Sequence, residues 1–166
     1  MDWLSEDLLL LALEAGRGSL GRIYGMDYAL MGAELVRLAA CGRIDIVDDQ
    51  VVVRSPAPTG DAELDAALAT IADSASPPRP GDWVQRPRAR ICGRYLARLT
   101  GTGVICEQTR FKITRWRITN TARLADARQR LDLIACSAGP VDLGHTAYAA
   151  LACAIGLDRL LYPGRR

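Results

Sequence analysis

The sequence is poor in the residues on which most enzymes rely. Its only histidine is His145, and it contains no G-x-S-x-G, H-E-x-x-H or phosphate-loop motif. Hydrolytic triads need a histidine oriented by a carboxylate beside a nucleophile, so we expect His145 to cap a helix or lie at the surface. The acidic pairs Asp48–Asp49 and Asp61–Asp65 fall in turns or on a polar helix face, where we expect them to be solvated. We therefore expect no enzymatic activity.

Closely spaced cysteines and long apolar stretches are also lacking. The five cysteines are far apart and form no C-x-x-C pair, which argues against a disulfide framework or a zinc site and favours a reducing compartment. The apolar run Leu8–Leu13 follows an acidic start, unlike a signal peptide, and is too short to cross a bilayer. We expect the second apolar run, Thr146–Leu157, to form a buried helix. We expect a cytoplasmic protein without a metal or other cofactor.

Aromatic residues are few, at 5% of 166 residues, so the core must consist of Leu, Ile, Val and Ala, a composition typical of packed helices. Periodicity and capping residues predict a single domain, residues 1–166, with a mainly α fold: a helical bundle with two short β-hairpins. Four helices have candidate N-caps: Asp27, Thr59 or Asp61, Thr119 or Asn120, and Asp142. The expected helices span residues 3–15, 27–40, 88–99, 121–137 and 142–161, with another through Leu64, Leu68 and Ile71; the hairpins span 43–53 and 104–118, and 74–82 is an exposed linker.

The pattern of a helix followed by a hairpin occurs twice. Residues 35–44 (L-V-R-L, then Gly42 and Ile44) recur at an offset of 61 as residues 96–105 (L-A-R-L, then Gly103 and Ile105). Winged-helix DNA-binding modules have the same pattern, so nucleic-acid binding is an alternative function. A recognition helix should be basic, and only the second unit meets this condition. Its arginines are Arg88, Arg90, Arg94 and Arg98.

The formal net charge of +2 conceals three unequal segments. Residues 1–78 hold five arginines and thirteen acidic residues, residues 79–117 hold nine arginines and one lysine against two acids, and residues 118–166 hold six arginines against four acids. A basic segment in a near-neutral chain is typical of contact with phosphates of nucleic acids or lipid headgroups. Two alternatives remain open. In the first, the basic segment pairs with the acidic part of the same chain. In the second, it pairs with the acidic part of a second subunit, and the protein is a structural homo-oligomer.

Residues 16–21 read G-R-G-S-L-G and match the G-x-G-x-x-G pattern. The dinucleotide fingerprint requires a strand before the first glycine, but here the preceding segment is a predicted helix. We therefore expect no nucleotide site at these glycines.

A more specific resemblance is centred on residues 55–68, which read S-P-A-P-T-G-D-A-E-L-D-A-A-L. Matching segments precede and follow it: residues 6–13 (E-D-L-L-L-L-A-L), 35–39, 42–44, 77–78, 83–84, 94–96 and 103–105. Over roughly residues 4–120 the sequence resembles the Golgi phosphoprotein 3 family. The resemblance implies a compact, bacterial member with a helical fold and a projecting hairpin. It also implies peripheral docking on membranes through phosphatidylinositol 4-phosphate, binding of glycosyltransferase tails, and self-association through the hairpin.

The resemblance further implies a lipid-headgroup pocket, but its four family positions are changed here, to Arg22, Met31, Ala89 and Cys92. Neighbouring arginines can rebuild such a site, because guanidinium groups need only converge on a phosphate. We therefore expect a membrane-docking adaptor that binds anionic phospholipid headgroups. The candidate headgroup residues are Arg22, Tyr24, Arg88, Arg90 and Arg94.

The second hairpin alternates cations with apolar residues, as segments at a lipid interface do. A hairpin that packs one face on the domain and exposes the other to solvent would show the same alternation of polar and apolar residues. The expected partners are an anionic membrane surface, membrane-protein tails and a second copy of the chain, with nucleic acid only in the alternative. The candidate residues for membrane or oligomer contact are Phe111, Lys112, Arg115, Trp116 and Arg117.

Overall fold

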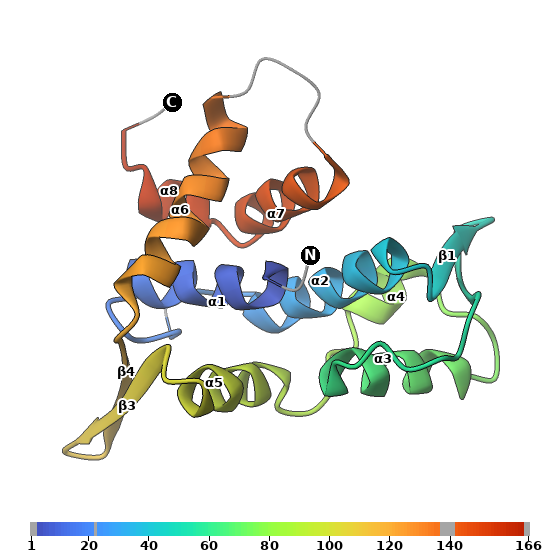
Figure 1. Cartoon of the computed structure of the whole chain (residues 1–166), viewed down its shortest axis with the longest axis horizontal. Helices are drawn as coiled ribbons and strands as arrows, with labels where there is room; N and C mark the ends of the chain where they lie inside the picture. The colour runs from blue at the N-terminus through green and yellow to red at the C-terminus, as the bar shows by residue number, and fades with distance from the viewer. Residues whose placement is uncertain (1–2, 22, 137–141, 165–166) are drawn as a thin grey trace.

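The computed structural model describes residues 3–21, 23–136 and 142–164, and within these ranges it contains eight helices and two antiparallel β-hairpins (Figure 1). This confirms the helix-dominated fold class. The helices are α1 (Leu4–Ala15), α2 (Met26–Ala40), α3 (Ala62–Ala72), α4 (Pro80–Val84), α5 (Ile91–Gly101), α6 (Thr121–Cys136), α7 (Leu143–Ala154) and α8 (Leu157–Leu161). The hairpins pair β1 (Ile44–Val47) with β2 (Gln50–Val53), and β3 (Ile105–Arg110) with β4 (Ile113–Ile118).

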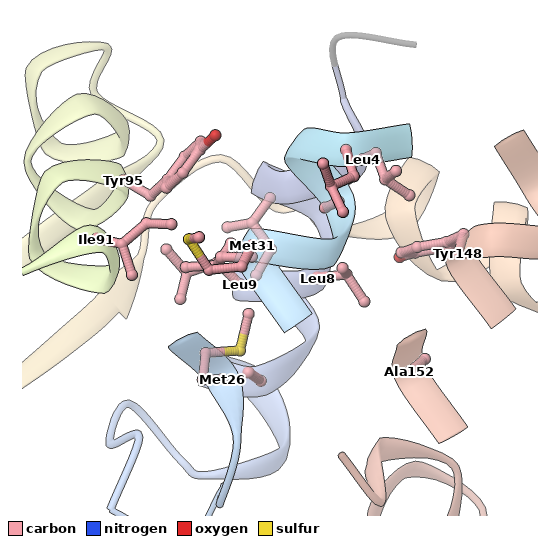
Figure 2. Packing of buried hydrophobic residues seen from close by; sticks show 14 of the residues in the cluster. Leu4, Leu8, Leu9, Met26, Met31, Ile91, Tyr95, Tyr148 and Ala152 are labelled. Atoms are coloured by element: carbon pink, nitrogen blue, oxygen red, sulfur yellow. The ribbon is translucent and has the colours of Figure 1, made fainter. Parts of the chain in front are cut away.

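Helix α1 lies at the centre of the fold, between α5 on one side and α6 and α7 on the other (Figure 1). Its apolar run Leu8–Leu13 is buried throughout. Figure 2 shows Met31 of α2 and Ile91 of α5 on one side of this core and Tyr148 of α7 on the other. A helix that is apolar on all sides must be covered on all sides, so this run organises the packing of the other helices.

The two helix–hairpin units have matching backbone geometry. Each helix is followed by a glycine with positive φ, Gly42 at 68° and Gly103 at 72°. Each hairpin turns through two residues of positive φ, Asp48–Asp49 and Phe111–Lys112, which suits the twist of a two-residue hairpin. The repeat predicted from the sequence is therefore present in the structure. Equivalent hydrogen bonds of 2.9 Å close both helix ends: Arg43 N–H to Leu38 O, and Val104 N–H to Leu99 O.

Among the predicted N-caps, Asp61, one of the two alternatives for its helix, and Asp142 are confirmed, and Asn120 accepts a hydrogen bond of 3.0 Å from the backbone N–H of Arg123. The carboxylate of Asp61 accepts hydrogen bonds from the first backbone N–H groups of α3, and that of Asp142 does the same for α7. The prediction for Asp27 is wrong. Helix α2 begins one residue earlier, at Met26, because Gly25 adopts the left-handed conformation (φ 83°) and turns the chain into the helix there.

Three other boundaries differ from the expected ones. Helix α5 begins at Ile91, so Arg88 and Arg90 precede it, and Arg90 has a left-handed φ of 58°. The helix expected over residues 142–161 is divided by Gly156, whose φ is 72°. The expected linker ends in α4, which Pro80 can begin because the first turn of a helix needs no N–H partner there.

Candidate anion-binding surface

The arginines at the start of α5 lie against carboxylates from the acidic part of the chain. Arg88 pairs with Glu34 and also lies 3.3 Å from Glu63, while Arg94 lies 3.6 Å from Glu63. The Glu34 side chain has 0% exposure. Burial raises the pKa of Glu34 to about 7, although Arg88 lowers it. Here the basic segment faces the acidic part of the same chain, as one of the open alternatives predicts.

Asp61 joins the two helix–hairpin units. Its Oδ1 accepts the N–H of Glu63 at 3.0 Å, and its Oδ2 accepts hydrogen bonds of 2.7 Å from both Arg37 and Arg98, which the 61-residue offset relates. Burial raises the pKa of Asp61, but the hydrogen bonds from Arg98 and Arg37 outweigh it and hold the pKa at about 2. The expectation of a solvated carboxylate is therefore wrong for Asp61, which is a structural junction.

The other candidate headgroup residues lie in separate surroundings. Tyr24 is 86% exposed in the segment before α2. Arg90 is exposed and forms no ion pair with any residue that the structure describes. The Arg94 side chain is 48% exposed beside Glu63. Arg22 lies outside the described residues. Among the four candidate headgroup residues that the structure describes, only Arg88 and Arg94 lie together, and both lie beside the Glu63 carboxylate.

The three family headgroup positions that the structure describes do not form a cationic pocket. Met31 is fully buried in the core, and Ala89 is an exposed residue ahead of α5. Burial, together with the nearby carboxylate of Asp27, raises the pKa of Cys92 to about 12. None of these three positions offers a cation, and Asp27 adds negative charge beside Cys92.

The β3–β4 hairpin presents a basic face. The register pairs Cys106 with Arg117, Gln108 with Arg115 and Arg110 with Ile113, and partners in an antiparallel pair share a face. The three arginines and Lys112 are exposed and form no ion pair within the described chain. At the tip, Phe111 is 84% exposed and Ile113 61%. The hairpin surface comprises Arg110, Phe111, Lys112, Ile113, Arg115 and Arg117.

Trp116 belongs to the opposite face of this hairpin. Its register partner is Glu107, and its side chain is partly buried against the core. The backbone N–H of Trp116 donates to the Gly18 carbonyl at 2.9 Å, which joins β4 to the loop after α1. The two interpretations of the alternating sequence therefore apply to different faces, because Trp116 packs on the fold while Arg115 and Arg117 face solvent.

The single histidine stands beside a helix cap. His145 Nδ1 pairs with Asp142, the N-cap of α7, and the His145 ring lies 5.5 Å from the Trp3 ring. Among the described residues, no three His, Cys, Asp or Glu side chains are grouped so that they could hold a metal ion. Nor does any helix in the described ranges have the length and apolarity needed to cross a membrane.

Comparison with protein families gives a match over nearly the whole chain. The family model described as Golgi phosphoprotein 3 (GPP34) matches residues 4–166. The match includes α6, α7 and α8, beyond the roughly 120 residues on which the resemblance in the sequence rests. A search of curated proteins gives no match.

Proposed function

The chain belongs to the Golgi phosphoprotein 3 (GPP34) family, and from this premise we propose that it is a peripheral membrane-docking adaptor that binds anionic phospholipid headgroups of the phosphatidylinositol 4-phosphate type. The hairpin surface is the main membrane contact in this proposal. The observation that carries the proposal is its set of cations, Arg110, Lys112, Arg115 and Arg117, which no carboxylate of the described chain neutralises. Each cation near an anionic bilayer contributes about 1 kcal/mol to binding.

The position of the hairpin suits this role. Strands β3 and β4 project from one end of the molecule, and the β1–β2 hairpin lies at the opposite end (Figure 1). Asp45, Asp48 and Asp49 are exposed on the β1–β2 hairpin, but Asp45 lies 3.0 Å from Arg54 and Asp49 lies 3.7 Å from Arg79. An anionic bilayer attracts the unpaired cations of the β3–β4 hairpin more strongly than this charge-paired end, so the difference would orient the protein with the β3–β4 hairpin toward the lipid.

The apolar tip adds a second contribution. Phe111 stands at the turn with most of its ring in solvent, and the Arg110 guanidinium lies 5.2 Å from the ring centroid. A side chain of this kind can enter the headgroup region while the arginine stays among the phosphates. Arg90 and Arg94 lie at the end of α5 away from β3, so they are secondary candidates that need separate substitution.

The test is flotation with neutral, phosphatidylserine and phosphatidylinositol 4-phosphate vesicles. We expect R115Q/R117Q to bind anionic vesicles about 30-fold more weakly than wild type, because two cations contribute about 2 kcal/mol. The matched control is R54Q/R79Q, which removes two exposed arginines that lie beside Asp45 and Asp49, away from the β3–β4 hairpin. It changes the net charge equally and should bind nearly as wild type does.

Serine substitutions separate insertion from packing. F111S should weaken vesicle binding without lowering the melting temperature, whereas W116S should lower the melting temperature, because Trp116 packs against the core. If wild type ignores all anionic vesicles but binds duplex DNA, the membrane proposal is wrong and the nucleic-acid alternative replaces it. If phosphatidylserine and phosphatidylinositol 4-phosphate vesicles recruit it equally, the function is general anionic binding.

A further inference from the structure

A groove of about 370 Å³ lies between the end of α1, the loop that follows it, and strand β4. Three arginines line this groove: Arg17 from the loop, and Arg115 and Arg117 from the hairpin. Arg17 stands in the G-x-G-x-x-G segment, far from the hairpin in sequence. None of the candidate headgroup residues named from the sequence lines this groove, so it is separate from the family headgroup pocket, although Arg115 and Arg117 also belong to the hairpin surface.

The loop backbone holds Arg17 close to the hairpin. A Cβ atom on Gly18, whose φ is +82°, would lie 2.6 Å from the Trp116 carbonyl oxygen, and one on Gly16 would lie 1.8 Å from the Ser19 oxygen. The two glycines thus permit a close backbone approach that other residues would block. Arg17 has a φ of 53°, which is uncommon outside glycine. Of the three glycines in the pattern, Gly18 allows the contact between the loop and β4, and Gly16 allows the turn of the loop itself.

The groove carries positive charge that the described chain leaves unbalanced. Glu14 is the only acidic residue among its lining residues, and the Glu14 Oε1 atom accepts a hydrogen bond of 2.6 Å from Arg128. Arg17, Arg115 and Arg117 form no ion pair with any described residue. Three like charges lining one groove repel one another, and a bound anion would relieve that repulsion.

We propose that this groove binds a phosphomonoester group. Such a group carries close to two negative charges at neutral pH and offers three terminal oxygens, which suit the fork-shaped donors of several guanidinium groups. A phosphodiester carries one charge and two free oxygens, so it matches three arginines less well. The group can belong to a lipid headgroup or to a soluble phosphate ester. The lipid form rests on the proposed function, whereas binding of a soluble ester does not.

The test compares a groove variant with a tip variant of equal charge. R17Q/R117Q changes two groove residues, and R110Q/K112Q changes two cations that do not line the groove. Vesicles containing phosphatidic acid, a phosphomonoester, are compared with phosphatidylserine vesicles at the same zeta potential. We expect wild type to prefer phosphatidic acid at least about tenfold, because the phosphodiester of phosphatidylserine has one terminal oxygen fewer to accept charge-assisted hydrogen bonds from the groove arginines. The groove variant should lose this preference, and the tip variant should bind both vesicles more weakly but keep it.

A second measurement uses inorganic phosphate at constant ionic strength and follows arginine side-chain N–H resonances of the wild-type protein. Saturable shifts at Arg17, Arg115 and Arg117, with Arg110 unmoved, support the groove. Saturation by phosphate without any vesicle binding assigns the site to a soluble ester and removes the proposed membrane function. Vesicle binding without preference for phosphatidic acid, together with unsaturable shifts at all four arginines, overturns the groove and leaves the proposed function standing. Unchanged circular dichroism spectra establish that each variant is folded.

Discussion

Replacing Arg88 with methionine tests the conclusion that this arginine is a counter-ion within the fold. The Arg88 side chain is 11% exposed, and its partner Glu34 is 0% exposed. Without Arg88, the Glu34 carboxylate keeps only the Tyr95 hydroxyl, at 3.2 Å, among the partners that the structure describes. Removing one member of a buried ion pair costs about 3–5 kcal/mol of stability, because the remaining charge stays buried and unpaired.

The size of the effect should depend on pH. At pH 8 the cost approaches about 3 kcal/mol, which corresponds to a fall in melting temperature of roughly 6–12 °C for a chain of this length. At pH 5 the cost should be smaller, because the Glu34 carboxyl of R88M can bind a proton and lose its charge. The double variant R88M/E34Q removes both charges and should recover stability to within about 1 kcal/mol of wild type.

The assay is urea unfolding of wild type, R88M and R88M/E34Q at both pH values, followed by vesicle flotation of the double variant. Retained vesicle binding by a stable R88M/E34Q protein would identify Arg88 as structural, while lost binding would restore it as a headgroup ligand. The reasoning is refuted if R88M costs less than about 1 kcal/mol at pH 8 or costs the same at pH 5.

Two further predictions concern wild-type stability and the loop after α1. Burial raises the folded-state pKa of Glu34 to about 7 and that of Asp7 to about 6, both above their ordinary values near 4. The folded protein therefore binds these protons more tightly than the unfolded chain, so the stability that these two groups contribute should be fully present below about pH 4 and be lost as pH rises through about 6 to 7, as measured by urea midpoints. Asp61, whose pKa is lowered to about 2, acts in the opposite direction and should reduce stability only below about pH 4. E34Q and D7N should each flatten this profile. G18A should lower stability by roughly 1–3 kcal/mol, because Gly18 has a φ of +82° and an added Cβ would lie 2.6 Å from the Trp116 oxygen; G81A, where a Cβ meets open space, is the control.

Much of the fold follows from short-range patterns. Apolar periodicity places α1 and α2, and paired turn residues of positive φ form both hairpins. The caps at Asp61 and Asp142 act on N–H groups two or three residues away. The offset of 61 residues is visible in the sequence because both units use the same local devices. The Asp27 error is small for the same reason, since a neighbouring Gly25 competes for the same helix start.

The helical class, the two hairpins and the segment with the excess of positive charge can all be predicted from the order of the residues. Which cations stay available to a ligand depends on how the helices pack. Arg88 meets Glu34 across 54 residues of sequence, so its charge is neutralised inside the fold, whereas Arg17 reaches the groove beside Arg115 and Arg117. Local sequence patterns cannot distinguish an arginine that is neutralised inside the fold from one that is available to a ligand. The difference depends on which helices pack together and how deeply each carboxylate is buried.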